Sequence, residues 1–171
     1  VKLAQELGGQ TAVLSAQTTY DFSNGDTITT DFDTTGNNLT FIAAGFQAAN
    51  SSVNISGTGS LTLTGGGNSF FNLLAPAINT YSGGTTITDT NLIIGNGYSY
   101  GGFVGDVVNN GRVTFNKDNT TTYAGNMSGT GTLTKIANNT LTLTGNSTQA
   151  NTTVTQGVLA TGAGGTTSSI S

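Results

Sequence analysis

Apolar and polar residues alternate along most of this chain, in short runs that end at glycine or asparagine. In Leu61-Thr62-Leu63-Thr64, for example, the leucines would face a buried side and the threonines a wet side, because successive side chains of a strand point in opposite directions. This period of two predicts β-strands. The predicted strands are residues 27–29, 39–42, 53–55, 61–64, 86–88, 92–94, 107–108, 113–115, 133–134, 141–143, 153–155 and 158–159.

Tight turns separate these runs, and they allow two architectures. Pairs such as Asn110-Gly111 and Asn138-Asn139 supply the positive φ that tight turns require. Asn-Gly between alternating strands is typical of hairpins and would build an antiparallel β-sandwich. A right-handed parallel β-helix, or β-solenoid, is favoured instead, because the strands are very short and one of their faces is polar. Its rungs would hold about 20 to 25 residues each.

One motif occurs twice and supports a repeating architecture. The first copy is Ser56-Gly57-Thr58-Gly59, followed at once by Ser60 and the Leu-Thr-Leu-Thr-Gly run of residues 61–65. The second copy starts at Ser128, and its Leu-Thr-Leu-Thr-Gly run is residues 141–145. About three rungs would fit between the copies. The extra residues Leu133 to Thr140 in the second copy indicate that a strand-turn unit was gained or lost.

The composition agrees with an all-β protein and excludes several partners. Roughly one residue in five is Thr, and charged residues make up only 7% of the chain, against about a quarter in an average domain. With a net charge of −4 and four cations in total, the chain lacks the clustered basic residues that nucleic acid or an anionic membrane surface requires. No apolar run is long enough for a membrane-spanning helix.

The chain has no Cys and no His, which excludes the usual nucleophilic triads, thiol chemistry and common zinc sites. We therefore predict no catalytic residue, no metal site and no cofactor. The run Asp31-Phe32-Asp33-Thr34-Thr35-Gly36 partly matches a calcium loop, but the Glu expected at position twelve is Ile42. We interpret it as a solvated loop. The alternative is a polysaccharide-cleaving β-helix enzyme that uses Asp31 and Asp33 as its acids.

The repeated motif resembles the autotransporter-associated β-strand repeat. The resemblance is carried by residues 128–135 and 140–146, by the Asn-Thr-Tyr-Ser-Gly-Gly-Thr-Thr-Ile segment at 79–87, and by the lead-in segments 109–115 and 123–129. It covers about half of the chain, mostly residues 53–65 and 79–160. The sequence departs from the repeat at Ala137-Asn138-Asn139, where glycines are usual, and at the block 66–78.

The resemblance implies a bacterial autotransporter passenger displayed as a β-helix on the cell surface, of the surface-antigen or adhesin type. It implies a non-catalytic role in adhesion or surface display, with anchoring in the outer membrane through a translocator barrel that this chain lacks. Expected partners are a host-surface protein, a glycan or another copy of the chain. A purely structural spacer is the other alternative. The motif is specific for fold and export route and weak for activity.

Two irregular segments are the candidate binding sites, because exposed apolar side chains often mark interfaces. One interrupts the repeat with large apolar residues, and the other places aromatic residues among glycines, where they could stack on sugars or pack at an interface. In each case the competing interpretation is that the side chains fill the core. The candidates are Phe70, Phe71, Leu73, Leu74, Pro76, Ile78, Tyr98, Tyr100 and Phe103.

We expect residues 1–171 to form a single solenoid segment of a longer passenger. Within it, residues 1–20 are predicted to be an N-terminal cap, since the end rungs of a solenoid need covering. Residues 66–80 are predicted to be an inserted loop. Residues 1–50 match the repeat poorly, so their place in the solenoid rests on strand pattern alone.

Overall fold

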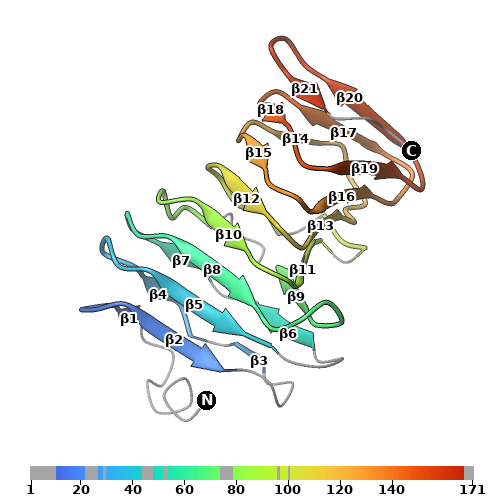
Figure 1. Cartoon of the computed structure of the whole chain (residues 1–171). Coiled ribbons are helices and arrows are strands. Elements are labelled where there is room, and N and C mark those ends of the chain that lie inside the picture. Colours follow the sequence, from blue (N-terminus) through green and yellow to red (C-terminus); the bar gives the residue numbers. More distant parts are fainter. Residues whose placement is uncertain are drawn as a thin grey trace.

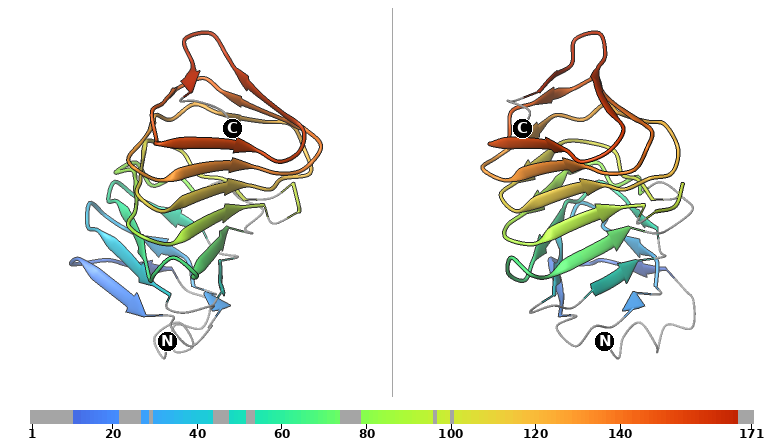
Figure 2. Two further views of the ribbon diagram at one scale, coloured as in Figure 1. Left: turned by 45° about the vertical axis from the view of Figure 1, so that its right-hand side comes forward. Right: turned by 90° about the vertical axis from the view of Figure 1, so that its right-hand side faces the viewer.

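The computed structural model describes residues 11–21, 27–28, 30–43, 48–51, 54–73, 79–95, 97–99 and 101–167. These residues form twenty-one short strands and no helix. The strands follow one another around a shaft, so that each successive rung stacks on the one before (Figure 1). Two further views show the N-terminal and C-terminal segments at opposite ends of this stack (Figure 2).

One side of the shaft is an eight-stranded sheet. Its strands pair only in parallel, for example Leu39 of one strand with Leu61 of the next. In order, the strands are β2 (Thr18–Asp21), β5 (Leu39–Ile42), β8 (Leu61–Thr64), β10 (Thr85–Ile87), β12 (Val107–Asn109), β15 (Met127–Ser128), β18 (Asn146–Ser147) and β21 (Thr166–Thr167).

The second side is a seven-stranded sheet, also wholly parallel. Phe71, Leu92, Val113 and Leu133 stand in register along it, and all four side chains point into the core. In order, the strands are β3 (Thr27–Ile28), β6 (Ala48–Ser51), β9 (Phe70–Leu73), β11 (Asn91–Ile94), β13 (Arg112–Phe115), β16 (Thr132–Lys135) and β19 (Asn151–Val154).

The third side is interrupted. Three strands cover it near the N-terminal end, three cover it near the C-terminal end, and a single parallel bridge joins Asn79 to Phe103 between them. The first group is β1 (Ala12–Val13), β4 (Phe32–Asp33) and β7 (Ile55–Ser56), and the second is β14 (Thr121–Tyr123), β17 (Thr140–Leu143) and β20 (Val158–Thr161).

The predicted solenoid is confirmed, and the antiparallel sandwich is excluded for the described residues, where every strand pair is parallel. The rungs differ in length, since the step from Thr140 to its partner Val158 is shorter than the step from Leu61 to its partner Thr85. The alternation of the sequence follows from this geometry, because leucine points into the shaft while threonine stays half-buried at its surface. In β8, for instance, Leu61 and Leu63 are buried and Thr62 is not.

The core changes character along the shaft. Near the N-terminal end, Phe41 lies beside Tyr20, Phe32 and Phe71, with ring centroids 5.6 to 6.3 Å from its own. Near the C-terminal end, the interior holds the buried side chain of Gln149, whose amide donates to Thr152 and accepts from Ser147. The C-terminal rungs thus hold a hydrogen-bonded polar side chain in the interior in addition to buried leucines such as Leu141 and Leu143.

The glycines of the repeated motif are required by the corners of the shaft. Gly57 and Gly129, the first glycines of the two copies, have φ of +96° and +110°. A Cβ on Gly59 would lie 1.9 Å from the carbonyl oxygen of Asn37, and one on Gly131 would lie 2.3 Å from that of Gly111. The first glycine thus supplies a left-handed turn, and the second lets two rungs approach closely.

The two copies of the motif lie at different corners. In the first, the glycine turn leads from β7 into β8 of the eight-stranded sheet. In the second, it leads from β15 of that sheet into β16 of the seven-stranded sheet, and the Leu-Thr-Leu run lies further on, in β17. The extra residues predicted to be a strand-turn unit hold most of β16 and the corner that follows it. The spacing between the copies is therefore not a whole number of rungs.

Polar side chains tie successive rungs together at one corner. The carboxylate of Asp106 accepts from the backbone N–H of Asn126 (2.8 Å), and the amide oxygen of Asn126 accepts from the backbone N–H of Asn146 (3.0 Å). The amide oxygen of Asn146 in turn accepts from the hydroxyl of Thr166 (3.1 Å). Stacked Asn and Asp residues thus satisfy corner backbone groups that no sheet pairs.

Ala137 offers a test of how the corners are built. It stands at φ +87°, where the sequence departs from the glycines usual in the repeat. A Cβ in this region costs about 1–2 kcal/mol, while a glycine adds less than that in unfolded-chain entropy. Ala137→Gly is therefore expected to raise the free energy of unfolding by about 0.5–1 kcal/mol, measured by urea denaturation.

The control for this change is Ala160→Gly in strand β20. There the same substitution is expected to lower the free energy of unfolding by about 0.5–1 kcal/mol, because it only frees the unfolded chain. A loss of stability in Ala137→Gly as large as in Ala160→Gly would contradict this account of the corner.

The structure bears on the predicted divisions of the chain in two places. Within the expected cap, residues 1–10 lie outside the described part, whereas Ala12–Val13 and Thr18–Asp21 are strands of the solenoid. Within the expected inserted loop, Phe70–Leu73 form β9 and pair with β6 and β11. They do so because Phe71 continues a ladder of core positions that β11 extends with Leu92.

Candidate functional site

A cavity opens in the third side of the shaft, at its interruption. It has a volume of about 230 Å³ and lies between the segment Gly101–Gly105 and strand β14. Phe103 is bridged to Asn79 of the preceding rung, but no backbone hydrogen bond joins Gly101–Gly105 to β14. On the other two sides the same rungs are held by the pairs β12–β15 and β13–β16. The cavity thus results from a local loss of pairing in an otherwise continuous stack.

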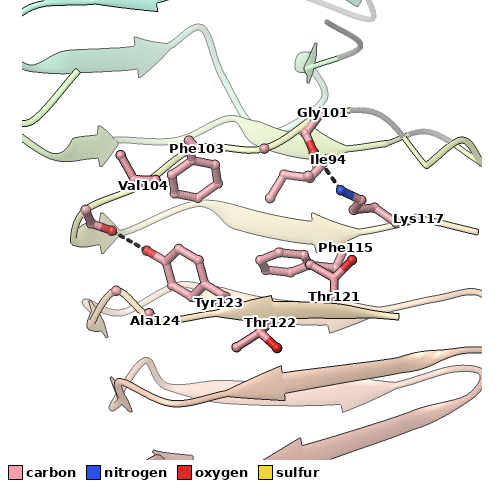
Figure 3. Close-up of a pocket in the computed structure, with 13 residues that line it drawn as sticks. Ile94, Gly101, Phe103, Val104, Phe115, Lys117, Thr121, Thr122, Tyr123 and Ala124 are labelled. Carbon is pink, nitrogen blue, oxygen red and sulfur yellow. Dashed lines mark hydrogen bonds between the residues drawn. The ribbon is translucent and has the colours of Figure 1, made fainter. Parts of the chain in front are cut away.

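Three aromatic side chains form the wall of this cavity (Figure 3). The ring of Tyr123 lies 5.3 Å from that of Phe103 and 5.9 Å from that of Phe115, tilted against each by about 54° or less. All three side chains are at least 94% buried. Tilted rings at these distances pack favourably, so the three rings form a mainly apolar wall.

Two polar groups close the cavity by bonding to backbone carbonyls. The hydroxyl of Tyr123 donates to the carbonyl oxygen of Gly105 (2.7 Å), and Nζ of Lys117 donates to that of Gly101 (2.8 Å) (Figure 3). Burial lowers the pKa of Lys117, although the nearby carboxylate of Asp118 partly offsets this. These two side-chain hydrogen bonds join the neighbouring rungs where strand pairing is missing, and they stabilise the edges of the cavity.

Tyr123 supplies a prediction about stability and pH. Burial, with smaller contributions from Asp106 and Tyr81, raises the pKa of Tyr123 well above its usual value. The folded chain therefore keeps a proton that the unfolded chain releases near pH 10. This contribution to stability is complete below pH 10 and is lost as the pH rises towards the folded pKa.

Tyr123→Phe removes both the hydrogen bond to Gly105 and this dependence on pH. We expect it to lower the free energy of unfolding by about 1 kcal/mol at neutral pH, and we expect the gap from the parent chain to shrink above pH 10. Urea denaturation at pH 7 and at about pH 10.5 measures both. Tyr98→Phe, at an exposed position, is the control and should change little. A gap that widened at high pH would contradict the assignment.

The structure separates the candidate residues that the sequence singled out. Phe103 lines the cavity, whereas Tyr98 is 55% exposed and is not part of the lining. Phe71 is buried in the core of β9, and Phe70 points to the outer side of the same strand, half-buried. Leu73 ends β9. Leu74, Pro76, Ile78 and Tyr100 lie outside the described residues.

Sequence reasoning missed Phe115, Tyr123 and Lys117. Phe115 and Tyr123 occur in runs that alternate like any other strand, and they meet Phe103 only because the rungs place them side by side. For Lys117, the one available signal was its position among only four cations in the chain.

The two acidic residues considered as catalytic groups or calcium ligands accept hydrogen bonds from backbone N–H groups. Asp31 accepts from the N–H of Asn54 on the next rung (2.8 Å), and Asp33 accepts from that of Thr35 (3.1 Å) in a local turn. Phe32, between them, is a core residue. Among the described residues, no group of three or more acidic side chains lies close enough to hold a metal ion.

No known family model and no solved structure matches the chain. A search of curated proteins finds that it is similar to the adhesin BmaC autotransporter of Brucella suis biovar 1 (strain 1330), with 48% identity over 50 residues. The match spans 29% of this chain and 2% of that protein. It agrees with the parallel solenoid and with the repeat resemblance. The chain fits an autotransporter passenger domain.

The solenoid presents mostly short polar side chains on its outer face. The outward positions of β8, β16 and β17 are occupied by threonine, and its exposed large apolar side chains are scattered over several rungs. In its described residues, no helix is long and apolar enough to cross a membrane. The cavity and the polar corners are therefore the features of the described residues that depart from the regular solenoid.

Proposed function

We propose that this chain is a non-catalytic segment of an autotransporter passenger, displayed at the bacterial surface, where it acts in adhesion. The observation that carries the proposal is the combination of a parallel solenoid with a match to an autotransporter adhesin. Anchoring would come from a translocator barrel in a part of the protein outside this chain. A stiff shaft suits this role, because it holds binding groups away from the cell that displays them.

The chemistry of the surface supports binding over catalysis. A polysaccharide-cleaving enzyme needs two carboxyl groups free to face a substrate. Asp31 and Asp33 instead accept hydrogen bonds from backbone N–H groups of the solenoid. The cavity beside Phe103 is lined by aromatic and aliphatic side chains and by Lys117, Thr121 and Thr122, without a carboxylate. A partner would thus be held by packing and hydrogen bonds.

Binding of the purified chain to host cells tests adhesion directly. Fluorescently labelled chain is expected to bind cultured epithelial cells saturably, and an excess of unlabelled chain should displace it. Absence of saturable binding would contradict an adhesive role for this segment and would favour the spacer. Display is tested separately by protease treatment of intact bacteria, where cleavage within this segment is expected. A segment protected until the cells are lysed would contradict surface display.

A further inference from the structure

A polar trough lies at the corner where the eight-stranded sheet passes into the seven-stranded sheet. It has a volume of about 360 Å³. Strand pairing brings its members together, because Asn91, Arg112 and Thr132 begin β11, β13 and β16 and stand in register on three successive rungs. The trough is lined mainly by Asp89, Thr90, Asn91, Asn110, Arg112 and Thr132, and is called the Arg112 trough below.

The guanidinium of Arg112 is available to a ligand. Among the described residues it makes no hydrogen bond and no ion pair, and its side chain is exposed. The other two described cations are engaged, since Lys117 donates to Gly101 and Lys135 donates to the carbonyls of Ile136 and Ala137. Arg112 is thus the one cation of the described chain that can meet a partner, and its planar fork of donors suits a carboxylate.

Two amides in the trough are oriented to donate. The amide oxygen of Asn91 accepts from the hydroxyl of Thr114 (3.0 Å). That of Asn110 accepts from the N–H and hydroxyl of Thr130 (3.2 and 3.3 Å). With their oxygens occupied, both side chains keep free N–H groups. Together with Arg112, they make this corner rich in donors.

Asp89 adds a carboxylate to the trough, which accepts hydrogen bonds and repels a simple anion. Its carboxylate accepts from the hydroxyl of Thr64 and the N–H of Gly65, both at 2.9 Å. Burial alone would raise the pKa of Asp89, but hydrogen bonds from the backbone of Gly65 and Gly66 and from Thr64 lower it. The ionised carboxylate forms no ion pair with Arg112, although both line the trough. The trough therefore offers a donor fork on one part and an acceptor for hydroxyl groups on another.

We propose that the Arg112 trough binds an acidic sugar, a pyranose that carries a carboxylate. The carboxylate would pair with the guanidinium of Arg112, and ring hydroxyls would bond to Asn91, Asn110 and Asp89. A small inorganic anion is expected to bind more weakly, because the carboxylate of Asp89 repels it. Such an anion also has no hydroxyl group that could donate a hydrogen bond to Asp89. The lining contains no aliphatic or aromatic residue against which an apolar ligand could pack. The inference rests on the adhesive function proposed above and names the class of ligand for it.

Titration of the chain with glucuronate, followed by NMR chemical-shift changes, tests this directly. A ligand of this size is expected to bind with a dissociation constant on the order of 1 mM. Glucose, which lacks the carboxylate, and acetate, which lacks the ring hydroxyls, are each expected to bind at least about tenfold more weakly. Equal binding of acetate and glucuronate would overturn the sugar assignment, as would the absence of glucuronate binding.

Arg112→Gln is expected to weaken glucuronate binding by about tenfold or more. The matched control is Asn119→Asp, which lowers the net charge by the same one unit at an exposed position outside the trough. It should leave the binding unchanged. If both variants lost the same amount of glucuronate affinity, the loss would be due to overall charge, and the proposed site would be wrong.

The cell-binding assay separates this inference from the function on which it rests. If parent chain and Arg112→Gln bind host cells equally, adhesion stands and the trough fails as its site. If the chain binds glucuronate through Arg112 but does not bind cells, the sugar site stands and the adhesive function fails.

Discussion

Gly65→Ala is expected to lower the free energy of unfolding by about 4 kcal/mol. Gly65 closes the first Leu-Thr-Leu-Thr-Gly run at φ +148°, and a Cβ there would lie 1.4 Å from the carbonyl oxygen of Ala43. The two rungs cannot separate easily, because the N–H of Ala43 donates to the carbonyl of Thr64 and the N–H of Gly65 donates to Asp89. The variant must therefore either break those hydrogen bonds or hold its Cβ in steric overlap with the carbonyl oxygen of Ala43.

The neighbouring glycines form a matched series for this prediction. Gly66 has φ +95° but open space where a Cβ would be, and Gly67 has open space and no positive φ. Gly66→Ala is expected to cost only the backbone strain, about 1–2 kcal/mol, and Gly67→Ala less than about 0.5 kcal/mol. Urea denaturation should give this order of stability. If Gly65→Ala cost no more than Gly66→Ala, close approach of the rungs would not be the reason for the glycine.

Phe41→Ala is expected to destabilise the N-terminal half of the shaft by about 4 kcal/mol. Phe41 is 98% buried and contacts an aromatic ring on each of three strands, those of Tyr20, Phe32 and Phe71. These strands belong to all three sides of the shaft. Truncation of Phe41 to alanine therefore leaves a cavity in the core, between the three sheets.

Two variants calibrate the effect of Phe41, measured by urea denaturation. Phe41→Leu is expected to cost about 1–2 kcal/mol, because Leu63 fills the same position on the next rung. Val13→Ala, at a side chain that is 64% exposed, should cost less than about 0.5 kcal/mol. A loss in Phe41→Ala no larger than in Val13→Ala would show that the aromatic cluster contributes little to stability.

The sequence predicted the solenoid and twelve of the twenty-one strands, because alternation along a strand is a local signal. The strands that it missed, such as Phe32–Asp33 and Met127–Ser128, are mostly too short to show a period of two. Alternation assigned Leu61 and Leu63 to the core, and the motif glycines marked corners, which the φ of Gly57 and Gly129 bears out. Alternation also separates Phe71, in the core, from Phe70, on the outer side, although the adjacent pair drew attention as a single apolar feature.

The surface sites could not be predicted in the same way, because they depend on register between rungs. Asn91 and Arg112 are distant in the sequence but directly paired in the sheet. The length of each rung decides which side chains become neighbours, and this length varies along the shaft. The cavity beside Phe103 lies where β14 has no paired strand on one edge. The sequence of β14 itself does not indicate whether a neighbouring strand pairs with it.

The placement of the repeated motif at two different corners has a consequence for how such a shaft grows. The motif encodes a turn and one side of a rung, and it leads into the eight-stranded sheet in one copy and into the seven-stranded sheet in the other. A duplication of one such unit would rotate everything downstream by a third of a revolution about the axis. Gene-level insertions could thereby redirect a binding surface around the shaft without altering any residue within it.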